Sequence, residues 1–141
     1  MKIRNLVLFV VVCLLSVACA TQAQPTAIEA VASKGLFQIV KADGSTFDVT
    51  LEAVKALPLA QLTVENKVQE GPKLKDILAL AGVTEFTEIT IEGSTAASTL
   101  TFAQVDDNTI FDFSNRGTMK LATTYIPKAN WTKDVSKITV K

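Results

Sequence analysis

The stretch that most constrains the fold is residues 71–83, which read GPKLKDILALAGV. Four apolar residues in it recur at i, i+3, i+4 and i+7, the spacing of one face of an α-helix. They are Leu74, Ile77, Leu78 and Ala81. Pro72 suits the first helical turn, and Gly82 suits the left-handed conformation that ends a helix. We therefore expect a central helix buried against a sheet, at roughly 1.5–3 kcal/mol per large apolar side chain before entropy is subtracted.

Short alternating runs of apolar and polar residues surround this helix and predict strands. The expected strands are Leu36–Lys41, Thr46–Thr50, Ala60–Val64, Asn66–Gln69, Glu88–Glu92, Ser98–Thr101, Thr109–Phe113, Leu121–Ile126 and Lys137–Lys141. Among them, Thr109–Phe113 is apolar enough for a central strand. Thr50 also suits the cap of a short helix over Leu51–Ala56. Short strands with two or three short helices predict one α+β domain, mostly β, over residues 35–141.

Residues 1–23 have the features of a signal peptide. Lys2 and Arg4 precede an apolar run over residues 6–15, which is short for a membrane span. Small residues follow, and two interpretations stay open: cleavage by a general signal peptidase, or a segment ending at Cys19 that resembles a bacterial lipoprotein box. In the second case Cys19 would carry the lipid. Either way we expect an exported protein, periplasmic, secreted or lipid-anchored to the outer face of a membrane, with residues 24–34 as a linker.

The remaining composition excludes several kinds of function. Without residues 1–23 the chain keeps twelve basic and fourteen acidic residues, a net charge of −2, which is no footprint for nucleic acid or anionic lipid. Both cysteines, Cys13 and Cys19, lie in the leader, and the chain has no histidine. A Ser-His-Asp or Cys-His nucleophilic site, a zinc site of the usual His or Cys type, and haem with such ligands are therefore excluded from the domain.

The order of the segments resembles the oxidoreductase molybdopterin-binding domain, the fold of the cofactor domain of sulfite oxidase and its small bacterial relatives. Four passages carry the resemblance: Val49–Pro58, Gly71–Val83, Leu100–Gly117 and Trp131–Val140. It implies that fold, with short strands around one central amphipathic helix. It also implies a cofactor pocket near the turn at residues 115–117.

This chain lacks several residues of the family pattern, and their absence weakens the case for the activity that the resemblance implies. Enzymes of this family bind molybdenum through a cysteine thiolate and contact the pterin with histidine and several arginines. Here the domain has neither cysteine nor histidine, and Arg116 is its single arginine. We therefore predict no catalytic residue, no metal ligand and no cofactor, with molybdopterin kept as an alternative.

Four residues are the candidates for contact with a cofactor or another anionic ligand. Lys73 and Lys75 stand at the start of the expected central helix, where lysines and backbone N–H groups can meet a phosphate. Asn115 and Arg116 lie in the expected turn, and a guanidinium suits carboxylate or phosphate. A simpler interpretation is favoured for both pairs: solvated lysines offset by Asp76, and a polar hairpin turn.

Two other groups of residues have simpler explanations. Asp106, Asp107 and Asp112 lack the spacing of a calcium loop and are expected to be solvated carboxylates. Trp131 is expected to lie in the core under a loop.

Three functions are consistent with this sequence. The leading one is an exported, non-catalytic binding module that holds a small ligand or a partner protein in the cell envelope. The first alternative is a molybdopterin-dependent oxidoreductase, or an electron-transfer accessory, with non-cysteine ligation. The second is an envelope protein-interaction domain without a small ligand.

Overall fold

The computed structural model describes residues 35–141. The predicted signal peptide, the lipid attachment at Cys19 and the linker lie outside these residues. The elements, in chain order, are β1 (Gly35–Val40), β2 (Thr46–Thr50), α1 (Leu51–Lys55), β3 (Leu59–Val64), β4 (Lys67–Pro72), α2 (Leu74–Leu80), β5 (Glu88–Glu92), β6 (Ser98–Thr101), η1 (Phe102–Gln104), β7 (Thr109–Phe113), β8 (Met119–Thr123), η2 (Lys128–Asn130) and β9 (Lys137–Val140). Within the described part of the chain, no helix has the length and apolar character to cross a membrane.

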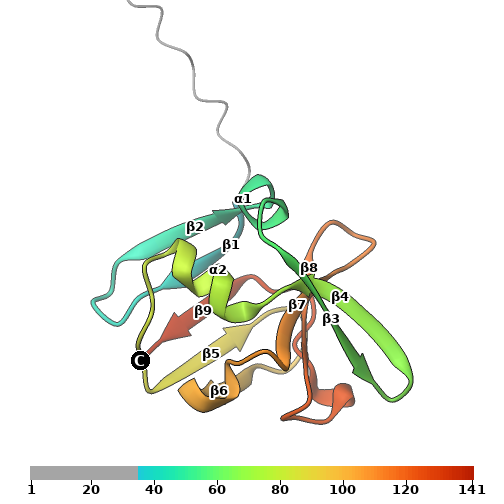
Figure 1. Cartoon of the computed structure of the whole chain (residues 1–141). Helices are drawn as coiled ribbons and strands as arrows, with labels where there is room; N and C mark the ends of the chain where they lie inside the picture. The colour runs from blue at the N-terminus through green and yellow to red at the C-terminus, as the bar shows by residue number, and fades with distance from the viewer. Residues whose placement is uncertain (1–34) are drawn as a thin grey trace, which may run out of the picture. The chain divides into compact units, whose positions relative to one another are not determined.

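The strands form three small sheets, so the described residues are mostly β (Figure 1). The largest has five strands in the order β2-β1-β9-β5-β6, and the other two are the hairpins β3–β4 and β7–β8. Strand β9 pairs in parallel with β1 and antiparallel with β5, so the last strand of the chain is the middle strand of the sheet. The prediction of a central strand over Thr109–Phe113 was wrong in this respect, because apolar character reports burial and not the choice of pairing partner. These residues form β7, which pairs with β8 in a two-stranded sheet.

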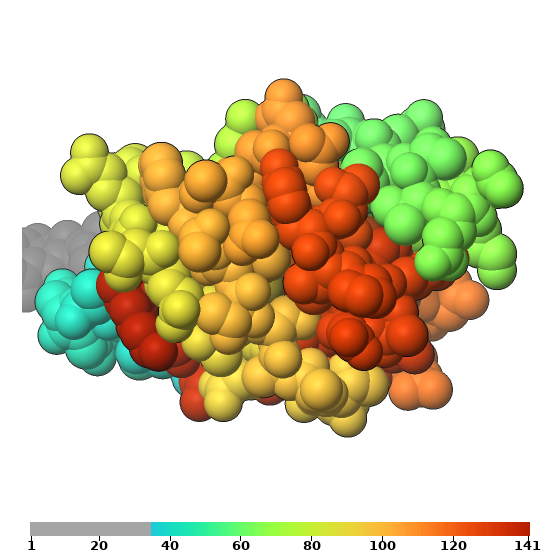
Figure 2. Space-filling model, turned by 90° about the horizontal axis from the view of Figure 1, so that it is seen from below, coloured from blue at the N-terminus to red at the C-terminus, as the bar shows by residue number. Residues whose placement is uncertain are grey.

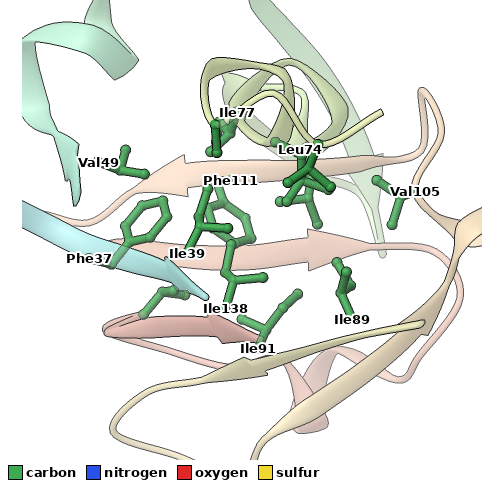
Figure 3. Close-up of a cluster of buried hydrophobic side chains, with 14 of the residues drawn as sticks. Phe37, Ile39, Val49, Leu74, Ile77, Ile89, Ile91, Val105, Phe111 and Ile138 are labelled. Atoms are coloured by element: carbon green, nitrogen blue, oxygen red, sulfur yellow. The ribbon is translucent and has the colours of Figure 1, made fainter. Parts of the chain in front are cut away.

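Helix α2 lies against the core, as its apolar spacing predicts. Leu74, Ile77 and Leu78 are buried and join a cluster with residues from β1, β5, β7 and β9 (Figure 3). Gly82 takes a φ of 73° and ends the helix in the left-handed conformation, as predicted. Pro72, in contrast, is the last residue of β4 and pairs with Leu59, so the expectation that it begins the helix was wrong.

The β3–β4 hairpin is held against β7 by a close approach of two backbones. A Cβ added to Gly71 would lie 1.8 Å from the carbonyl oxygen of Phe111. One residue further on, Lys73 forms an isolated antiparallel bridge with Ile110. Beneath this crossing lies a second apolar cluster, which consists of Leu62, Ile110, Ala122 and Trp131. This close approach fixes the start of α2 relative to β7, and therefore positions Lys73 and Lys75.

Candidate ligand pocket beside helix α2

The two predicted lysines converge on one carboxylate that is distant in the sequence. The Nζ atoms of Lys73 and Lys75 lie 2.8 Å and 2.6 Å from Oδ1 of Asp107. Their hydrogen bonds lower the pKa of the Asp107 carboxyl from 3.8 to about 2. The same bond raises the pKa of Lys75, with smaller effects of the same sign from Asp76 and Asp106. Both lysines are thus offset mainly by Asp107, in the loop before β7, while Asp76, the residue expected to offset them, has a smaller effect on Lys75.

The other two predicted residues lie in the turn between β7 and β8. The amide of Gly117, at a φ of 75°, donates to the carbonyl oxygen of Ser114, which closes the turn. The side chain of Arg116 is 81% exposed, and its Nη1 lies 3.5 Å from a carboxylate oxygen of Asp134. The structure therefore gathers the four predicted residues into two pairs at opposite ends of β7, and not into one site.

Arg116 and Asn115 border a cavity of about 260 Å³. Asp134 also borders it, and hydrogen bonds from Thr118 and then from Ser94 lower the pKa of that carboxyl. The cavity is open to solvent on a hairpin turn, and Lys120 and Lys133 border it together with the exposed Arg116. This is the polar turn of the simpler interpretation, with a built-in acid beside the arginine.

A second cavity, of about 310 Å³, lies beside α2 and is mainly apolar. We call it the α2 pocket. Its lining residues are Lys75, Asp76, Leu78, Ala79, Val83, Thr84, Phe86, Phe102 and Val105. The rings of Phe86 and Phe102 meet edge to face, with their centres 5.1 Å apart. Phe102 is nevertheless 53% exposed, so a large apolar ring stands at the border of the pocket with one side uncovered.

Local structure on two segments builds the α2 pocket. After Gly82 the chain turns back, because the Val83 amide donates to the carbonyl oxygen of Leu78, and residues 83–86 then form one wall. Beside them, Thr101 and Gln104 form a capping box that begins η1, whose first residue is Phe102. In Figure 2 the yellow segment that follows α2 and the light-orange segment around η1 lie next to each other on one face.

Sequence reasoning missed this pocket, although it named Lys75 as a candidate contact residue and Leu78 as a core residue. Lys75 was singled out for its charge, whereas Phe86 and Phe102 gave no signal that separates an exposed ring from a core ring. The signal that was available is the Thr101–Gln104 spacing, which predicts a helical turn immediately after a strand and therefore a sharp change in direction at Phe102.

The residues present do not fit molybdopterin in the way that the resembling family holds it. Residues 35–141 offer no thiolate and no imidazole, and among them no group of three or more potential metal ligands gathers. The single arginine is exposed on the turn after β7, whereas the lysine pair lies at the other end of that strand. The cations therefore fall into two separate groups, Lys73 with Lys75 beside Asp107, and Arg116 with Lys120 and Lys133 in a cavity that Asp134 also borders.

Comparison with known proteins gives likenesses to solved structures but no match by sequence. No family model matches the chain, and no curated protein matches it by sequence. Among solved structures, the chain is similar to the crystal structure of the sulfane dehydrogenase SoxCD from Paracoccus pantotrophus, with a TM-score of 0.58 and 16% sequence identity. The match covers 74% of this chain but only 37% of that chain. At this identity the likeness concerns the fold alone, and it agrees coarsely with the resemblance to an oxidoreductase domain.

Proposed function

We propose that residues 35–141 form a non-catalytic binding module whose α2 pocket takes the apolar part of a small ligand. The observation that carries the proposal is a mainly apolar cavity bordered by an uncovered aromatic ring. Concave, apolar sites with a few polar groups at the border are typical of small-molecule binding. The domain also lacks the thiolate and imidazole groups that its resembling family uses for chemistry, which supports binding over catalysis.

The module would act outside the cytoplasm. The features of residues 1–23 support export, and the lipoprotein-like segment ending at Cys19 supports attachment to a membrane surface as one form of it. In either form, residues 35–141 would be the part of the protein that binds the ligand.

The test is binding of 2-phenylethanol, a neutral aromatic probe, measured by ligand-observed NMR with protein purified from its own host. Ala79 borders the pocket and is exposed, so Ala79→Leu fills the entrance from the helix surface without a change in charge. We expect this variant to lose most of the binding. Ala56→Leu adds the same side chain at an exposed position of the α1 C-cap and is the matched control. Absence of binding to the unmodified protein, or equal binding by Ala79→Leu, would contradict the proposal.

The alternative function is a molybdopterin-dependent oxidoreductase or electron-transfer accessory with non-cysteine ligation. The likeness of the fold to a sulfane dehydrogenase is the observation that favours it. Elemental analysis for molybdenum and tungsten, with an assay for released pterin, on protein purified from its own host separates the two. We expect neither metal nor pterin. Stoichiometric metal with pterin would overturn the binding-module proposal.

A further inference from the structure

The carboxylate of Asp76 is the one charged group of the α2 pocket that forms no hydrogen bond or ion pair within residues 35–141. Its side chain is half-buried and borders the cavity. The other charged group there, Lys75, is held by Asp107 at 2.6 Å. Because no protein group donates to the Asp76 carboxylate, it is available to a ligand that supplies a donor.

The charges around the pocket favour a cation over an anion. Asp76, Asp106 and Asp107 outnumber Lys73 and Lys75, so this part of the surface carries a net charge of −1. Burial alone would raise the pKa of Asp106, but hydrogen bonds from Tyr125 and Asn108 outweigh it and lower that pKa, which keeps the carboxyl ionised near pH 7. Both lysines already share Asp107. An anionic ligand would therefore meet repulsion, with no free cation among these five groups to balance it.

The aromatic pair adds a second preference of the same sign. Phe86 and Phe102 border the cavity, and about half of the surface of Phe102 is exposed to solvent. The faces of aromatic rings attract cations. A positively charged nitrogen attached to an apolar body would thus find a carboxylate and an aromatic ring within one small cavity.

We infer that the α2 pocket binds small organic amines, with Asp76 pairing the ammonium group and the apolar body lying against Leu78, Val83 and the two phenylalanine rings. This inference rests on the proposed function, since it names the class of ligand for the same pocket. The ligands concerned have one protonated nitrogen on an aromatic or branched aliphatic body that fits about 310 Å³.

The test uses three compounds with one phenylethyl body and three charges: phenethylamine, 2-phenylethanol and 3-phenylpropionate. Binding is measured by ligand-observed NMR at pH 7 and low salt with protein purified from its own host. We expect the amine to bind about fivefold to tenfold more tightly than the alcohol, and the carboxylate to bind most weakly. The advantage of the amine over the alcohol should shrink as salt is added.

Two substitutions assign the preference to one carboxylate. Asp76→Asn should abolish the advantage of the amine over the alcohol, whereas Asp76→Glu should retain that advantage. Glu52→Gln removes a charge from the exposed face of α1 and is the matched control. Circular dichroism of each variant confirms that it folds.

The outcomes separate the two proposals. If the alcohol binds as tightly as the amine, if the carboxylate binds best, or if Asp76→Asn leaves the preference intact, the pocket stands and the assignment to amines is overturned. If none of the three compounds binds, or if all bind equally to Ala79→Leu, the proposed function fails and this inference fails with it.

Discussion

At Gly71 the domain depends on the absence of a side chain. The residue lies in β4 where it crosses β7, and a Cβ there would meet the backbone carbonyl oxygen and carbon of Phe111 at 1.8 Å and 2.7 Å. Neither atom belongs to a flexible side chain, so one of the two strands would have to move. This contact explains why a glycine stands in the interior of a strand, where it is otherwise unfavourable.

Gly71→Ala should therefore lower the free energy of unfolding by about 1–3 kcal/mol or more, as overpacking does in well-packed interiors. Gly35→Ala is the control, because its added Cβ would meet nothing closer than 3.8 Å. The control should change stability by no more than about 0.5 kcal/mol. Urea denaturation of both variants measures the difference, and equal stabilities would show that the two strands are not fixed at this crossing.

Asp107 offers a titration that reports on its two lysine contacts. Its pKa in the folded protein is about 2, below the ordinary value of 3.8. For a carboxyl with a lowered pKa, the contribution to stability is fully present above the ordinary pKa and is lost as the pH falls through the folded value. The contacts of Lys73 and Lys75 should thus weaken between about pH 4 and pH 2.

Carbon-detected NMR of the carboxyl groups should give a midpoint near 2 for Asp107. Lys75→Met should raise that midpoint toward 3.8, since one of the two hydrogen bonds that lower it is removed. High salt should act in the same direction, because Asp107 and both lysines are partly or largely exposed. A midpoint near 3.8 in the unmodified protein would contradict the contacts.

At the scale of the element, helix α1 is short enough for its cap to decide whether it forms. It has five residues, and the Thr50 hydroxyl accepts a hydrogen bond from the Ala53 amide at 3.2 Å. Thr50→Ala should cost about 0.5–2 kcal/mol of stability, and Thr50→Ser should cost much less because serine is an equivalent cap. Thermal unfolding of the two variants measures this. Equal melting temperatures would mean that β2 and the buried Val54 hold α1 without the cap.

The elements that the sequence predicts well are those defined by local signals. The bounds of β5 and β6 match the expected strands Glu88–Glu92 and Ser98–Thr101, and the apolar face of α2 is buried as expected. Pro72 was misplaced because proline suits both a helix start and the end of a strand. The pairing of Pro72 with Leu59 places it at the end of a strand and not at the start of the helix, and Leu59 belongs to another strand.

The candidate site was less predictable, because it depends on contacts between distant residues. Lys75 and Asp107 are separated by 32 positions, and neither position alone indicates the other. Likewise, Phe102 became visible as a pocket residue only once η1 was placed beside Phe86. The sequence shows which residues are charged, but it does not show which residues of opposite charge pair with them.

At the scale of the whole molecule, the fold is closed by its last strand. Strand β9 lies between β1 and β5 in the five-stranded sheet, so it joins the first described strand to the middle of the chain. Ile138 and Val140 of β9 are buried in the same cluster as Ile77 of α2. The helix and the sheet therefore share a core that is incomplete until residues 137–141 are in place.

Deletion of residues 137–141 should therefore abolish the cooperative fold rather than weaken it. The deletion removes two ladders of hydrogen bonds and leaves the edges of β1 and β5 without a partner in the centre of the sheet. Two buried side chains are lost as well, each of which would cost about 2–5 kcal/mol if truncated to alanine. That total approaches the whole stability of a typical domain, about 5–15 kcal/mol.

Ile138→Val is the control for the sequence change alone and should cost only about 0.5–1.5 kcal/mol. Thermal unfolding followed by near-ultraviolet circular dichroism, which reports on the packing of Trp131, distinguishes the two. A sharp transition in the shortened protein would show that β1 and β5 hold the core without β9, and that the middle of the sheet is less essential than its position indicates.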